Sequence, residues 1–313
     1  MPKTEILIVA PIRPDAMAAL EETYVCHHHY RHEDGESFLA EVGGRVRGAV
    51  SIGEKGVSAV QMDMMPNLEI ISCFGVGVDA IDLPAARERS VIVTNTPDIL
   101  SEEVADMGLA LIFMTLRGMI EADRYVREGR WPEGGPFTLG RTPRGKRLGI
   151  LGLGRIGMEL ARRAETIGMK VSYHNRTEKP VNYPYVADLV ELARQSDVLA
   201  LCCPGGPATH NLVDARVLDA LGPQGWLINI ARGSVVDEPA LIAALEGKAI
   251  AGAGIDVFAD EPRVPEALRQ MRNVVLQPHM ASATVETRDA MAQLVVDNLE
   301  AHFAGKPVFT RVG

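Results

Sequence analysis

An arginine, a glutamate and a histidine lie in the last third of the chain. These are the residue types needed to bind the carboxylate of an organic acid and to donate a proton to another oxygen of the same molecule. Arg232, Glu261 and His279 each follow a short apolar run that is typical of a buried strand. The guanidinium of Arg232 can bind a carboxylate through two parallel hydrogen bonds. A carboxylate near an imidazole favours the protonated ring, so Glu261 would keep a proton on His279 near neutral pH. Because open α/β sheets bind ligands at the carboxyl ends of their strands, we expect the three side chains to share a cleft.

A glycine-rich motif earlier in the chain predicts a dinucleotide site. A strand-like run leads into Gly152-Leu-Gly154-Arg155-Ile156-Gly157, and a helical pattern follows. Gly152 permits the tight turn, Gly154 lets backbone N–H groups approach the pyrophosphate, and Gly157 allows the helix to pack closely on the sheet. We expect Arg155 and Ile156 to contact the cofactor as well. The alternative is a glycine-rich turn in an unrelated α/β fold.

The residues about 20 positions beyond this motif indicate which coenzyme binds. An acidic residue there would bind the ribose of NAD, whereas an arginine accommodates the 2′-phosphate of NADP. The sequence has Asn175-Arg176-Thr177, which offers no carboxylate but supplies a charged and a hydroxyl contact. We therefore predict NADPH, with NADH possible but weaker. The alternative, that Arg176 is a solvated surface charge, stays open because Glu178 follows closely.

Short runs rich in Val and Ile, separated by helical patterns, predict an α/β protein built as two doubly wound domains. The first series of predicted strands covers 6–10, 48–52, 68–73 and 91–94. The second covers 147–152, 170–175, 198–203, 226–230, 251–257 and 274–277. A length of 313 residues also favours two domains over one.

Helices are predicted between and after the two series of strands. Ser101, followed by two glutamates, is a candidate N-cap, and apolar residues recur at three- and four-residue steps almost to Gly129. This pattern predicts one helix of roughly 40 Å at 1.5 Å per residue. The segment 131–147 is rich in Gly and Pro and predicts an ordered loop. A last helix from 284 to about 303 could pack back on the first domain.

Composition limits the class of protein. The net charge of -9 disfavours binding to nucleic acid or to anionic membranes. The longest apolar run, around 108–116, is about half of the roughly 20 residues that a membrane span needs. No export signal is recognisable, and the four cysteines lack metal or disulfide spacing, which predicts a soluble cytoplasmic protein with buried thiols. The run His27–His29 predicts a solvated strand rather than a metal site, so no metal is expected.

Singly, Arg232 could be a surface ion pair, Glu261 a turn residue and His279 a buried structural side chain. In combination with the glycine motif they resemble the D-isomer-specific 2-hydroxyacid dehydrogenases over nearly the whole chain. The matching segments are 152–157 (Gly-Leu-Gly-Arg-Ile-Gly), 229–237 (Asn-Ile-Ala-Arg-Gly-Ser-Val-Val-Asp), 254–258 (Gly-Ile-Asp-Val-Phe), Glu261-Pro262 and Pro278-His279. The resemblance implies that Arg232 binds the substrate, that His279 protonates it and that Glu261 pairs with His279.

The same resemblance implies further site residues. Gly75-Val76-Gly77 with Asp79 would form the substrate loop, and backbone N–H groups of a glycine-rich turn can hold a carboxylate. Trp131 resembles an aromatic residue that reaches the neighbouring subunit's substrate pocket, although a packed linker residue would look the same. The remaining implied cofactor contacts are Cys203, Pro204, Thr209, Ile230, Ala231, Asp256 and Ser282.

The resemblance also implies domain organisation and activity. A flavodoxin-like substrate domain would comprise 1–98 and 284–313, and a dinucleotide-binding domain 99–283 would form a homodimer. The Asn-Arg-Thr stretch resembles the NADPH-dependent glyoxylate, hydroxypyruvate and hydroxyphenylpyruvate reductases. We therefore expect reduction of a small 2-keto acid to the D-2-hydroxy acid; 2-ketogluconate also stays open as substrate. The alternative is a corepressor-like protein that senses NAD(P), which the negative charge, the coenzyme prediction and the absence of a tail beyond Gly313 disfavour.

Overall fold

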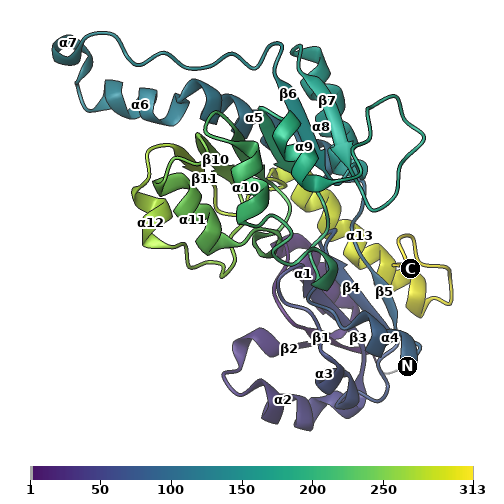
Figure 1. The fold of residues 1–313 in the computed structure, drawn as a ribbon. Coiled ribbons are helices and arrows are strands. Elements are labelled where there is room, and N and C mark those ends of the chain that lie inside the picture. The colour runs from purple at the N-terminus through teal and green to yellow at the C-terminus, as the bar shows by residue number, and fades with distance from the viewer. Residues whose placement is uncertain (1–2, 313) are drawn as a thin grey trace. The chain divides into compact units, whose positions relative to one another are not determined.

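The computed structural model describes residues 3–312 and divides the chain into two compact units. The first unit extends to Leu100 and resumes at Ala283, and the second is Ser101–Ser282 (Figure 1). Each unit is built on a parallel sheet with helices, which confirms the predicted α/β class. No helix among residues 3–312 is both long enough and apolar enough to cross a lipid bilayer.

The first unit contains a five-stranded parallel sheet in the order β2-β1-β3-β4-β5, the flavodoxin-like order. Its strands are β1 Glu5–Ile8, β2 Val25–His28, β3 Val46–Ile52, β4 Ile70–Phe74 and β5 Ile92–Thr94. Its α-helices are α1 Pro14–Thr23, α2 Gly35–Val42, α3 Ala59–Asp63, α4 Leu83–Glu88 and α13 Val285–Phe303. All five residues of β4 are buried, as expected for a strand covered on both faces. The predicted C-terminal helix, α13, packs on β4, where the Ser72 hydroxyl donates to the Val295 carbonyl over 3.3 Å.

The second unit contains a six-stranded parallel sheet in the order β11-β10-β9-β8-β6-β7, so all six predicted strands of this series are confirmed. The strands are β6 Arg147–Leu151, β7 Lys170–His174, β8 Val198–Leu201, β9 Trp226–Asn229, β10 Gly252–Ile255 and β11 Val274–Leu276. The α-helices are α5 Ser101–Arg117, α6 Met119–Arg127, α7 Trp131–Gly134, α8 Arg155–Thr166, α9 Leu189–Gln195, α10 Ala215–Leu221, α11 Glu238–Glu246 and α12 Glu266–Gln270.

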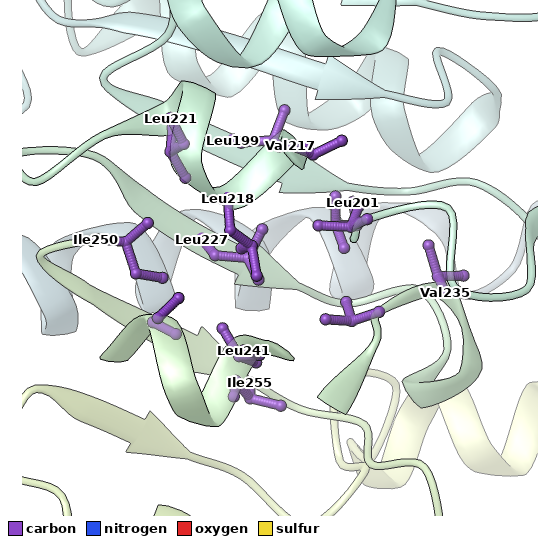
Figure 2. Packing of buried hydrophobic residues seen from close by; sticks show 14 of the residues in the cluster. Leu199, Leu201, Val217, Leu218, Leu221, Leu227, Val235, Leu241, Ile250 and Ile255 are labelled. Atoms are coloured by element: carbon purple, nitrogen blue, oxygen red, sulfur yellow. The ribbon is translucent and has the colours of Figure 1, made fainter. Parts of the chain in front are cut away.

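Alternate residues of the second sheet face two different helical layers. Figure 2 shows Leu199 and Leu227 of the sheet packed with Leu218 of α10 and Leu241 of α11 in one buried cluster. On the opposite face, α5 and α8 pack on each other, and α5 lies against β9 and β10. The sheet is therefore doubly wound, and the loops at the carboxyl ends of its strands are held on a rigid base.

The single long helix predicted after Ser101 is wrong. Gly118 adopts a left-handed conformation, with φ 60°, and separates α5 from α6. Glycine reaches this conformation without the penalty that a Cβ imposes, and the apolar spacing continues on both sides of the break. Ser101 is the first residue of α5 rather than a cap preceding it. The expected loop 131–147 also contains one short helix, α7.

The histidine run is a strand, as predicted, but it is not solvated. His27 and His28 lie on β2, and His29 begins a short 3-10 helix. The side chain of His27 contacts Glu5 over 2.7 Å, and that of His28 lies 3.3 Å from Glu21 on α1. The two adjacent rings thus have different acidic partners and are mostly buried, because helix α1 and strand β1 cover them.

Candidate active site

Glu261 and His279 form a hydrogen-bonded pair in the second unit. Nδ1 of His279 lies 2.7 Å from Oε2 of Glu261, and the other carboxylate oxygen accepts the Phe258 N–H over 2.8 Å. Both side chains are about three-quarters buried, with exposed fractions of 27% and 23%. Glu261 follows β10 and His279 follows β11, so the two residues come from neighbouring strand ends. The carboxylate therefore fixes which way the imidazole faces.

Burial acts to raise the pKa of Glu261, but other contacts outweigh it. The hydrogen bonds with His279 and with the Phe258 N–H, and the positive charge of Arg232, hold the pKa of this carboxyl below its usual value. Glu261 consequently stays ionised throughout the neutral range. An anionic partner at 2.7 Å favours a protonated imidazole, which is the form that can donate a proton.

Asp256 anchors the loop that carries His279. Its side chain is 1% exposed, and its carboxylate accepts the N–H groups of Met280 and Ala281 over 2.8 and 3.0 Å. Its backbone carbonyl accepts the His279 N–H over 2.8 Å. His279 itself has φ 50°, a left-handed conformation that is uncommon outside glycine. Burial raises the pKa of Asp256, although the two amides oppose the effect. This carboxylate therefore serves to hold the loop.

Arg232 lies in the loop after β9, in a region shaped by Asn229. The Asn229 side chain accepts the Ala231 N–H over 3.0 Å and donates to the Arg232 carbonyl over 3.1 Å. A Cβ at Gly233 would lie 1.9 Å from the Phe258 backbone, so only glycine lets this loop approach the Glu261 loop so closely. No role could be predicted from the sequence for Asn229, Gly233 or Phe258. The one sequence feature that could have indicated these residues is that they lie within the segments 229–237 and 254–258.

The glycine motif has the shape that a dinucleotide requires. Gly152 has φ 97°, and a Cβ there would lie 2.5 Å from the Cys203 backbone nitrogen. A Cβ at Gly157 would lie 2.3 Å from the Gly152 carbonyl oxygen, whereas the space around a Cβ at Gly154 is open. Helix α8 begins at Arg155 and presents its N-terminus at this open position. The turn therefore fits a pyrophosphate group.

Asn175 directly follows β7 and is tied to the glycine motif. Its side-chain oxygen accepts the Leu153 N–H over 2.8 Å, so its amide nitrogen is the group that can reach a ligand. Arg176 and Thr177 are exposed. An amide N–H donor beside an arginine and a threonine suits a phosphate group. A carboxylate at this position would instead suit the ribose hydroxyls.

The other expected cofactor residues surround the same sheet edge. Cys203 is buried next to the glycine turn, and the Thr209 hydroxyl donates to the Pro204 carbonyl over 2.7 Å, which closes the loop after β8. Ile230 and Ala231 are buried at the end of β9, so their backbone is what the loop can offer a ligand. Ser282 is half-buried after His279. Burial raises the pKa of Cys203 to about 11, as expected for an inert thiol.

In the first unit, the loop Gly75–Gly77 follows β4 and is firmly held. The Gly75 N–H donates to the Thr96 hydroxyl over 3.1 Å, and the Asn95 amide donates to the Val76 carbonyl over 2.9 Å. Val76 and Gly77 are half-buried, and Asp79 nearby is exposed. The loop thus presents a fixed backbone at the carboxyl end of its strand.

Trp131 lies at the start of α7 with 62% of its side chain exposed. Figure 1 shows α6 and α7 on an arm that projects from the second sheet. A tryptophan so exposed is not a packed linker residue within one chain.

A match to a known protein family identifies the kind of site that these residues form. Residues 109–281 match the family model described as D-isomer specific 2-hydroxyacid dehydrogenase, NAD binding domain. The chain belongs to the D-isomer-specific 2-hydroxyacid dehydrogenase family. Among its relatives is a hydroxyphenylpyruvate reductase from Plectranthus scutellarioides, which is 46% identical over 98% of each chain. A 2-ketogluconate reductase from Gluconobacter oxydans is 44% identical over 99% of each.

Solved structures of this dehydrogenase family show the same architecture. An NADPH-dependent glyoxylate/hydroxypyruvate reductase from Sinorhizobium meliloti, solved with NADP and malonate, has a TM-score of 0.92 and 42% identity. That similarity covers 99% of this chain and 97% of the other. The chain is therefore an oxidoreductase with a nicotinamide dinucleotide cofactor. These relatives favour reduction of a keto acid over the corepressor-like alternative.

Proposed function

We propose that this dehydrogenase reduces a small 2-keto acid to the D-2-hydroxy acid with NADPH, and that His279 is the proton donor. The observation that carries the proposal is the Glu261–His279 pair, 2.7 Å apart, in the same unit as the dinucleotide turn. Overall, one keto acid, one NADPH and one proton give one hydroxy acid and one NADP⁺. Glyoxylate, hydroxypyruvate, hydroxyphenylpyruvate and 2-ketogluconate are the candidate substrates.

A dinucleotide held at the turn of Gly152, Gly154 and Gly157 would supply a hydride to the keto carbon. His279 uses Nδ1 for Glu261, so Nε2 is the nitrogen that donates a proton to the ketone oxygen as that oxygen gains negative charge. Arg232 binds the substrate carboxylate through its guanidinium. We propose the backbone of Val76 and Gly77 as a further carboxylate contact, with residues 1–98 and 284–313 as the substrate domain and 99–283 as the cofactor domain.

A panel of the four keto acids with both coenzymes tests this function. We expect measurable steady-state turnover with NADPH on at least one of them, and slower turnover with NADH. Complete inactivity with both coenzymes would contradict the proposal. The panel also ranks the substrates, because pocket contacts discriminate one methylene by only about 1–3 kcal/mol.

Replacing Arg176 with alanine should change coenzyme selectivity. A charge-assisted hydrogen bond contributes about 1.5–3 kcal/mol, so the dissociation constant for NADPH should rise about 10- to 100-fold. NADH has no 2′-phosphate, and its dissociation constant should change less than about twofold. Fluorescence titration with each coenzyme measures both values. An unchanged preference would contradict the coenzyme assignment, and Arg216→Ala, an exposed arginine of the same unit, is the control.

Replacing Glu261 with glutamine should shift the pH profile of kcat. The pKa of Glu261 is lowered, so its charge is present at neutral pH and disappears only in acid. Without that charge the imidazolium is less favoured, and the alkaline limb of the profile should move to lower pH. We expect kcat at neutral pH to fall about tenfold and to recover partly as the pH is lowered. In contrast, Glu238→Gln, which alters a carboxylate bound to the nearby Ala259 N–H, should leave the limb in place. A limb unmoved in Glu261→Gln would contradict the pairing role.

We also propose that two chains form a homodimer through the arm of the cofactor domain. Large apolar side chains exposed on and beside this arm support a second copy as the occupant; they are Met119, Ile120, Val126, Trp131 and Leu139. Trp131 would then reach the partner's substrate pocket. Sedimentation at the mass of a single chain would refute the dimer.

We propose a cytoplasmic location because all four cysteines are free thiols, and cell fractionation tests this.

A further inference from the structure

Tyrosine hydroxyls hold the segment that follows Asn175. Three of the six tyrosines in the chain lie between residues 173 and 185. Tyr173 of β7 is fully buried, yet its hydroxyl accepts the Lys179 N–H over 2.7 Å and donates to the Lys179 carbonyl over 3.2 Å. Both hydrogen bonds end on the backbone of one residue. The segment is therefore fixed three positions after Arg176, independently of any side chain of the segment itself.

A second tyrosine fixes the other end of this segment. The Tyr185 hydroxyl donates to the Asn175 carbonyl over 3.1 Å. Tyr185 forms a parallel bridge with Tyr173, and their ring centroids are 5.5 Å apart. The Tyr185 ring also stacks on His174, whose Nδ1 contacts the Val186 carbonyl over 2.9 Å. The returning chain thus lies alongside β7 as a short extension of the sheet.

The anchored segment is also connected to the glycine turn. The Gly152 N–H donates to the His174 carbonyl over 2.9 Å, and the Leu153 N–H donates to the Asn175 side chain over 2.8 Å. Arg176 and Thr177 accordingly sit between two fixed points, Asn175 and Lys179, while their own side chains are exposed. The backbone here is held by contacts within the protein itself.

We propose that Tyr173 is a positioning residue for coenzyme selectivity, whose hydroxyl holds Arg176 and Thr177 where they bind the 2′-phosphate. The inference rests on the proposed NADPH preference. An exposed arginine loses side-chain entropy when it binds, and ordering its backbone at the same time would cost more. A segment held in advance avoids the second cost. NADH carries no 2′-phosphate, so the affinity for NADH should not depend on the Tyr173 hydroxyl.

The test is Tyr173→Phe, which keeps the buried ring and removes only the hydroxyl. Lys179 is exposed, and its carbonyl still accepts the Val181 N–H over 2.9 Å, so the variant should fold. The dissociation constant for NADPH should rise about three- to tenfold, while that for NADH and kcat at saturating NADPH change less than about twofold. Should this variant fail to fold, Tyr185→Phe gives the same test from the other anchor.

A double variant separates positioning from simple stabilisation. If Tyr173 acts by holding Arg176 and Thr177, Tyr173→Phe should cost much less NADPH affinity in an Arg176→Ala background than in the unaltered chain, because only the Thr177 contact is left to lose. Tyr125→Phe, whose hydroxyl donates to the Gly135 carbonyl in the same unit, is the matched control and should leave both affinities unchanged. Equal losses for NADPH and NADH in Tyr173→Phe, or additive losses in the double variant, would overturn the inference. If Arg176→Ala alone leaves NADPH binding unchanged, the proposed coenzyme choice fails instead.

Discussion

His279→Ala should abolish most turnover while coenzyme binding survives. General acid catalysis by a positioned side chain contributes about 10²- to 10⁴-fold, so kcat should fall by that factor. The imidazole is held by Glu261 at 2.7 Å and its loop by Asp256, so alanine at this position removes a proton donor whose place is fixed. The NADPH dissociation constant should change less than about twofold, because the dinucleotide turn is formed by other residues. Stopped-flow turnover and fluorescence titration on the same preparation measure both quantities.

Another histidine–glutamate pair supplies the matched control. His302 of α13 lies 3.0 Å from Glu69 in the first unit, with a similar half-buried setting. His302→Ala removes an equivalent ion pair and should leave kcat near the unaltered value. Full activity in His279→Ala would remove His279 from the mechanism. Comparable losses in both variants would show that the effect is one of stability rather than chemistry.

Arg232→Ala should lower kcat/KM for the keto acid by about 10²- to 10³-fold. Truncating one partner of a buried, hydrogen-bonded charge pair costs about 2–5 kcal/mol. In this variant a substrate carboxylate would lose the two parallel hydrogen bonds that the guanidinium donates. Arg232→Lys should recover only part of the loss, because a lysine keeps the charge without the planar geometry. The measurement is steady-state kinetics over a range of keto acid concentrations at saturating NADPH.

The control for Arg232 is a neighbouring arginine on the surface. Arg263 is exposed and pairs with Asp260 close to Glu261, so Arg263→Ala changes the same net charge without touching the proposed carboxylate site. It should change kcat/KM less than about twofold. If Arg232→Ala behaved like Arg263→Ala, the carboxylate would have to be bound elsewhere.

The sheets could be predicted from sequence because parallel strands buried on both faces read as short runs rich in Val and Ile. The closeness of Glu261 and His279 also followed, since both come after strands and carboxyl ends of parallel strands meet. The break at Gly118 could not be predicted, because apolar residues keep their helical spacing on both sides of it. A glycine within a helical pattern does not by itself show whether the helix continues.

The contacts that position the site residues could not be predicted from the sequence pattern. Gly233 matters through its approach to the Phe258 backbone, which lies 25 residues later and on another strand end. The Tyr173 hydroxyl reaches a backbone in a loop whose path no periodicity describes. Such contacts depend on how loops close over the sheet edge, and only coordinates reveal them.

The central claim, that this dehydrogenase reduces a 2-keto acid to the D-2-hydroxy acid, is tested most directly by the configuration of the product. Hydroxypyruvate is a suitable substrate because its reduction creates a new stereocentre. Chiral analysis after incubation with NADPH should find D-glycerate and no L-glycerate. L-glycerate, or a mixture of both enantiomers, would contradict the account.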